Sequence, residues 1–148
     1  MQDKTNRYPM VNLGVTLNEI PDKVAVFVEL GQCKNRCKEC HSAHYIHNKL
    51  HRALYTPLDL IVYKVQRQVH KGANAIVIMG GTNNYDMDTG KLIKLINALA
   101  DIAPVGVYSG ILDGAMIHRD IIKKSKLTWL KTGEYNAKLG GLNSPTTN

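Results

Sequence analysis

Three cysteines, the only ones in the chain, lie within eight residues of one another as Cys33, Cys37 and Cys40. A single loop with this Cys-x-x-x-Cys-x-x-Cys spacing can turn three thiolates toward one point, and thiolates bind zinc and iron well. An iron–sulfur cluster usually takes four cysteines, and a closed structural zinc site takes four ligands. The cysteines therefore predict a metal centre with one open position, where a small molecule binds and is activated.

Other interpretations of this stretch remain open. A zinc site that adds one of His41, His44 or His47 to the three cysteines has suitable donor types. Together with His51 these histidines also allow a second metal site, although histidines near a cluster loop more often cap, pack or bind substrate. The odd number of cysteines and the polar residues 1–5 argue against a disulfide framework in a secreted protein.

Composition bounds the class of protein. A length of 148 residues predicts a single domain over residues 1–148 with a hydrophobic core of its own. No apolar run approaches the length of a membrane span, so we expect no membrane partner and a cytoplasmic location. The net charge of +7 is spread along the chain, and one Phe and one Trp do not favour a base-stacking nucleic-acid interface.

Periodicity in the first thirty residues predicts a β-hairpin. Val11, Leu13, Val15 and Leu17 alternate with other residues, which indicates a strand over residues 8–20 with one buried face. A turn at residues 21–22 leads to a nearly continuous apolar strand over residues 24–30, of the kind buried on both faces. Residues 1–23 thus form the N-terminal hairpin region, and the cysteine loop follows the second strand directly.

Further along the chain, strands and helices alternate. Thr56 as N-cap and Pro57 at the first helical position predict a helix that starts near Leu58. The expected elements are helices over 58–70, 88–102 and 113–124, and strands over 75–79, 104–108 and 127–131. This order predicts an α/β fold of parallel βα units. Since a closed eight-stranded barrel needs about 250 residues, we expect a partial, open barrel.

Three unusual loops follow the predicted parallel strands. They are the cysteine loop, the stretch Gly80-Gly81-Thr82, and Ser109. Loops at the carboxyl ends of parallel strands meet at one rim, where α/β proteins place their active sites. Glycine lets the backbone adopt positive φ and approach a ligand closely. Ser109 is placed either to bind a polar ligand group or to cap the following helix.

The cysteine spacing resembles the signature of the radical S-adenosylmethionine (SAM) enzymes. In that family three cysteines hold a 4Fe–4S cluster, SAM chelates the fourth iron, and its reductive cleavage yields a 5′-deoxyadenosyl radical. The resemblance implies a barrel of the radical SAM type in which Gly80, Gly81 and Thr82 contact the SAM amino group. Thr82 stands where the family usually has an acidic residue. The resemblance also implies that the backbone of Glu39 contacts adenine and that Ser109 contacts SAM.

Two longer stretches are similar to one subfamily, the activating proteins of anaerobic (class III) ribonucleotide reductase. They are residues 37–44 in the cysteine loop and residues 130–148 near the C-terminus. This similarity implies an enzyme that generates a glycyl radical on the large subunit of the reductase, with an electron donor such as flavodoxin or ferredoxin. We expect the extended tail, residues 133–148, to help seat the reductase. The alternatives are another radical SAM enzyme and a non-enzymatic Cys3His zinc module.

Overall fold

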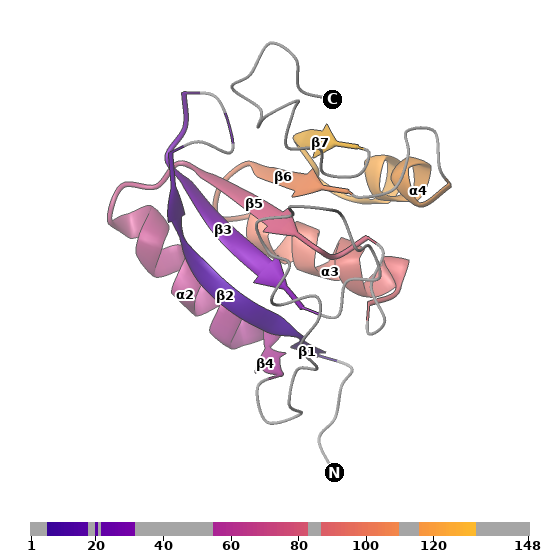
Figure 1. The fold of residues 1–148 in the computed structure, drawn as a ribbon, viewed down its shortest axis with the longest axis horizontal. Helices are drawn as coiled ribbons and strands as arrows, with labels where there is room; N and C mark the ends of the chain where they lie inside the picture. Colours follow the sequence, from indigo (N-terminus) through magenta and orange to yellow (C-terminus); the bar gives the residue numbers. More distant parts are fainter. Residues whose placement is uncertain are drawn as a thin grey trace, which may run out of the picture.

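The computed structural model describes residues 6–17, 20, 22–31, 55–82, 87–109 and 116–132, and Figure 1 shows how their elements are arranged. In chain order the elements are β1 (Arg7–Tyr8), β2 (Met10–Thr16), β3 (Ala25–Leu30), β4 (Thr56–Pro57), α2 (Leu58–His70), β5 (Ala75–Met79), α3 (Thr89–Ala100), β6 (Val105–Tyr108), α4 (Met116–Lys124) and β7 (Trp129–Lys131). The chain is therefore an α/β protein, as the alternation of patterns predicted. The cysteine stretch and residues 133–148 lie outside the described residues.

The main sheet has five strands in the order β2-β3-β5-β6-β7, which is also their order along the chain. β2 pairs antiparallel with β3, so the predicted N-terminal hairpin is confirmed. β3, β5, β6 and β7 are parallel neighbours. Because each crossover helix connects adjacent strands in the same direction, the carboxyl ends of the four parallel strands meet along one edge.

All three described helices pack on the same face of this sheet. One core cluster joins alternate residues of the strands, among them Val28, Ile78 and Val107, to buried residues of α2, α3 and α4. A second, smaller cluster on the opposite face contains strand residues and Ile20 but no residue of the described helices. In Figure 1 the sheet lies in front of α2 and α3, with its other face toward the viewer. No helix in the described ranges is long and apolar enough to cross a membrane.

The prediction of one buried face on the first strand is wrong at its far end. Val15 is 45% exposed and Leu17, just beyond β2, is 66% exposed. The physical reason is position: β2 is an edge strand of the five-stranded sheet, and alternation alone does not show whether a strand lies at an edge. The side chain of Asn12 accepts a hydrogen bond from the backbone N–H of Leu13 at 3.0 Å, which satisfies one donor of this strand.

The predicted cap of the first helix is also wrong, although the helix itself has the predicted bounds. Thr56 belongs to the short strand β4, which pairs with β1 through Tyr8. Pro57 occupies the N-cap position in an extended conformation, and no side chain caps the helix there. The backbone of Leu58 instead donates to the carbonyl of Asn6 at 2.8 Å. A distant segment therefore satisfies the helix start that a local signal assigned to Thr56.

The start of α3 is anchored to the N-terminal part of the chain. Asp88 caps the helix by accepting from the backbone N–H of Lys91 at 2.7 Å, within the predicted range of 88–102. The fully buried Tyr8 donates its hydroxyl to the carbonyl of Lys91 at 3.0 Å. Burial, and secondarily the Asp88 carboxylate, raises the pKa of Tyr8 to about 12. The phenol therefore stays protonated and keeps its role as donor through the physiological pH range.

Candidate functional site

The carboxyl ends of the parallel strands bring the predicted loops to one rim. Met79 and Tyr108 are register partners on β5 and β6, so the residues that follow them, Gly80 and Ser109, leave neighbouring strand ends. At the end of β3, the backbone of Gly31 donates to the carbonyl of Pro9 at 2.7 Å. The first cysteine follows Gly31 by two positions in the sequence. Cys33, Cys37, Cys40 and Glu39 themselves lie outside the described residues.

The chain's own packing explains the two glycines after β5. Gly80 has a φ of +85°, a conformation that glycine permits, and a Cβ atom there would overlap the carbonyl oxygen of Leu30. A Cβ atom on Gly81 would lie 3.0 Å from Leu92 and 3.1 Å from Leu30. Both glycines thus allow this loop to pack tightly against the end of β3. The loop therefore packs at the rim against Leu30, which precedes the first cysteine by three positions in the sequence.

Thr82 ends this described loop and is only 7% exposed. Its hydroxyl is therefore held in a largely dry environment, where a hydrogen bond to an ionic group is stronger than in water. A threonine supplies one donor and two acceptor positions without the desolvation cost of a carboxylate.

Ser109 connects β6 to two other elements. Its backbone N–H donates to the carbonyl of Lys131 on β7 at 2.7 Å. Its hydroxyl oxygen lies 2.6 Å from Nε2 of His118, the third residue of α4. The serine and the histidine are 3% and 2% exposed. The hydroxyl thus contacts a side chain of the helix that follows β6, where sequence analysis offered a ligand contact or a helix cap.

Sequence reasoning did not single out His118. A signal was available, because His118 precedes the buried Ile121 by three residues and so shares the apolar face of the predicted helix. A histidine on such a face needs a polar partner, and Ser109 is that partner in the fold.

Two rows of side chains cross the part of the helix-free face that lies toward the carboxyl rim. The inner row runs across the sheet from β3 to β7 as Phe27, Val77, Gly106 and Trp129, and the row nearest the carboxyl rim as Glu29, Met79, Tyr108 and Lys131. The inner row is apolar. The outer row adds a carboxylate, a phenol and an ammonium, so polarity increases toward the rim that carries the candidate loops.

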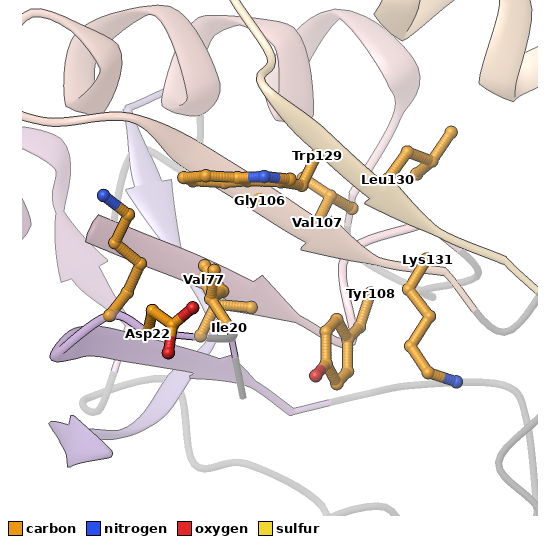
Figure 2. A pocket seen from close by; sticks show the side chains of 10 residues that line it. Ile20, Asp22, Val77, Gly106, Val107, Tyr108, Trp129, Leu130 and Lys131 are labelled. Carbon is orange, nitrogen blue, oxygen red and sulfur yellow. The ribbon is translucent and has the colours of Figure 1, made fainter. Parts of the chain in front are cut away.

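A hollow of about 590 Å³ lies on this face. It is lined by Ile20, Asp22, Lys23, Val77, Gly106, Val107, Tyr108, Trp129, Leu130 and Lys131. Figure 2 shows the Trp129 indole along one side and Ile20 with Val77 on another. Gly106 has no side chain and leaves the space between them open. A Cβ atom there would lie in van der Waals contact with Trp129 at 3.4 Å and Ile20 at 3.5 Å.

Charged groups stand at both ends of the hollow. Asp22, with a φ of +60°, and Lys23 lie in the turn before β3. At the carboxyl rim the Lys131 ammonium lies 5.7 Å from the centroid of the Tyr108 ring, and Figure 2 shows the two side chains next to each other. A hollow that is apolar in the middle and polar at both ends suits an extended ligand with an apolar middle.

Within the ranges that the structure describes, no three His, Cys, Asp or Glu side chains come together as a metal site. Comparison of the chain with models of protein families, with curated proteins and with solved structures found no match.

Proposed function

We propose that the protein is a radical SAM activase that generates a glycyl radical on the large subunit of anaerobic ribonucleotide reductase. The single observation that carries this proposal is the packing of the Gly80-Gly81 loop against Leu30, at the end of the strand that leads to the cysteines. A SAM molecule bound to the open position of a three-cysteine cluster would lie beside the end of β3. The Gly80-Gly81 loop, which packs against the end of this strand, would contact it.

The sheet order supports a partial barrel for this activity. Four parallel strands follow one another in chain order, and the described helices cover one face only. Successive right-handed βα units that advance in one direction curve toward a barrel, whereas a doubly wound sheet places helices on both faces. The helix-free face is then the inner surface of the barrel, and its hollow adjoins the rim.

Each group has a role in this proposal. Cys33, Cys37 and Cys40 would hold the 4Fe–4S cluster, and the cluster with SAM would supply the radical chemistry for removing hydrogen from the reductase glycine. Gly80 to Thr82 bind the SAM ammonium, and Ser109 and Glu39 support the nucleoside part. The hollow around Trp129 receives the segment of the reductase that carries the glycine. A flavodoxin or ferredoxin supplies the electron, and the reduced cytoplasm keeps the thiolates free.

Anaerobic purification tests the proposal directly. The expected protein is brown, contains about four iron and four sulfide per chain, and cleaves SAM to 5′-deoxyadenosine with a strong reductant. With the reductase subunit it should produce the EPR doublet of a glycyl radical. A colourless protein with one zinc per chain would identify the zinc module instead. SAM cleavage without a radical on the reductase would indicate another radical SAM enzyme.

Thr82→Val should weaken SAM binding about five- to tenfold while changing the melting temperature by less than about 3 °C. Valine has nearly the same shape but lacks the hydroxyl that accepts from the ammonium, and Thr82 is almost buried. Equilibrium dialysis with labelled SAM measures the affinity. Thr82→Ser keeps the hydroxyl and serves as the control. Equal affinities of the valine and wild-type proteins would show that Thr82 does not face the ligand.

Trp129→Ala should reduce the yield of glycyl radical about tenfold or more at limiting reductase, because a half-buried tryptophan that a partner covers is a typical energetic centre of a protein interface. Uncoupled SAM cleavage should stay within about twofold of wild type, since Trp129 lies in the inner row and not at the rim loops. Met116→Ala removes an apolar side chain that is 75% exposed on α4 and is the matched control. Equal radical yields in the two variants would exclude the hollow as the docking site.

A further inference from the structure

The contact between Ser109 and His118 is a buried hydrogen bond at the candidate site. The separation of 2.6 Å between the hydroxyl oxygen and Nε2 is within the range of a good hydrogen bond. Both side chains are almost completely buried. Either partner can donate, depending on the tautomer of the imidazole, so the contact persists in both tautomers.

A serine within hydrogen-bond reach of a histidine is also the arrangement of nucleophile and base in hydrolases. Such a serine must meet the carbonyl carbon of a substrate. Ser109 is 3% exposed and His118 is 2% exposed, so a substrate carbonyl does not reach the hydroxyl oxygen. The burial fits a fixed internal link better than an attacking group.

The helix that carries His118 is packed against the rest of the fold. Three residues later on α4, Ile121 is fully buried in the main core. The far end of α4 is tied to α3 through Asn97, whose side chain donates to the carbonyl of Lys124 at 3.4 Å and accepts from the backbone of Lys126 at 2.8 Å. The imidazole is thus presented to β6 by a helix whose buried face and C-terminal end are both held.

Ser109 transmits this support to the rim. Its backbone donates to Lys131 on β7, and the neighbouring strand end carries Gly80. The residue therefore lies between the loop after β5 and the last strand, with its backbone bound to β7 and its hydroxyl bound to α4. The end of β6, held by these two bonds, loses little freedom when the rim binds a ligand, and such preorganisation increases affinity.

We propose that His118 is a positioning residue, which by hydrogen bonding to the Ser109 hydroxyl fixes the end of β6 for SAM binding. The inference rests on the proposed function for the identity of the ligand. Its effect is on binding and not on the cleavage step, because the cluster ligands belong to the stretch after β3, on the other side of β5. His118 acts through Ser109 and does not itself touch the ligand.

The experiment uses the anaerobically purified protein with its cluster. His118→Leu and Ser109→Ala should each raise the Kd of SAM about tenfold, and the KM for SAM in uncoupled cleavage in parallel. The kcat at saturating SAM should remain within about twofold of wild type, as expected when an interaction contributes to binding alone. His118→Gln places an amide near the position of Nε2 and should restore the affinity to within about threefold of wild type.

Two comparisons separate positioning from general destabilisation. Ile121→Val weakens the packing of the same helix but leaves Ser109 and His118 unchanged. When its loss of melting temperature equals that of His118→Leu, its SAM affinity should still equal that of the wild type. The double variant Ser109→Ala/His118→Leu should bind SAM no more weakly than either single variant, because both remove the same bond. An Ile121→Val protein that binds as weakly as His118→Leu, or strictly additive losses in the double variant, would overturn the inference.

The inference and the proposed function fail in different ways. A wild-type protein that binds no SAM contradicts the proposed function, and the inference with it. Wild-type binding together with unchanged binding by His118→Leu contradicts only the role of His118. The melting temperatures of the single and double variants report the coupling of the two side chains without any reference to SAM.

Discussion

Replacing any one of Cys33, Cys37 or Cys40 with alanine is expected to abolish SAM cleavage, with a loss of more than about 1000-fold. The chain has three cysteines in all, so a variant with two has no spare thiolate to complete the site. Each cysteine thiolate contributes to the binding free energy of the cluster, so removing one of them lowers the affinity of the protein for the cluster. Iron and sulfide content and the formation of 5′-deoxyadenosine measure the result.

His44→Ala is the matched control for these variants, since it removes a possible metal ligand from the same stretch. A protein that keeps its cluster and activity without His44 supports a cluster held by cysteines alone. Loss of metal in the His44 variant to the same degree as in the cysteine variants supports a Cys3His zinc site. A full cluster and full activity in all three cysteine variants would refute the radical SAM assignment.

Gly80→Ala is expected to lower the free energy of unfolding by about 2–4 kcal/mol, which corresponds to a fall of about 6–12 °C in melting temperature. Two costs act together. An alanine at a φ of +85° is strained, and its Cβ atom would overlap the carbonyl oxygen of Leu30, a backbone atom that has little freedom to move. Because this contact also sets the loop against the end of β3, SAM affinity should fall with stability.

Gly72→Ala separates the two costs. Gly72 also has a positive φ, of +123°, but a Cβ atom there meets nothing within 4 Å. Its substitution should therefore cost only the backbone strain, about 1–2 kcal/mol, and leave SAM affinity unchanged. Thermal unfolding of both variants under the same anaerobic conditions makes the comparison. Equal melting temperatures would show that the contact with Leu30 contributes nothing.

Local patterns were sufficient to predict most elements of this fold. The helix over residues 58–70 and the strand over residues 75–79 were predicted with the observed bounds. The helices predicted over 88–102 and 113–124 are observed as Thr89–Ala100 and Met116–Lys124. Apolar periodicity is set by which side of an element faces the core, so it is visible in the sequence. The alternation of elements likewise predicted parallel strands and a common rim for Gly80 and Ser109.

Features that depend on distant neighbours were not predictable. Thr56 does not cap the helix, because β1 pairs with the strand that contains it. Val15 and Leu17 are exposed, because their strand lies at an edge of the sheet. In both cases the residues have the types that the local pattern requires, but pairing with other parts of the chain decided the structure.

The candidate site divides in the same way. Residue types and spacing indicated the three cysteines, the glycine pair and Ser109 as candidates for the chemistry, and the resemblance to the radical SAM enzymes added Thr82 and Glu39. Only the tertiary structure showed that Leu30 and Leu92 pack against the glycines and that the Ser109 hydroxyl contacts His118. The hollow around Trp129 likewise comes from strand register and from Ile20 in a distant turn. A sequence specifies these groups, but their separations depend on how the elements pack.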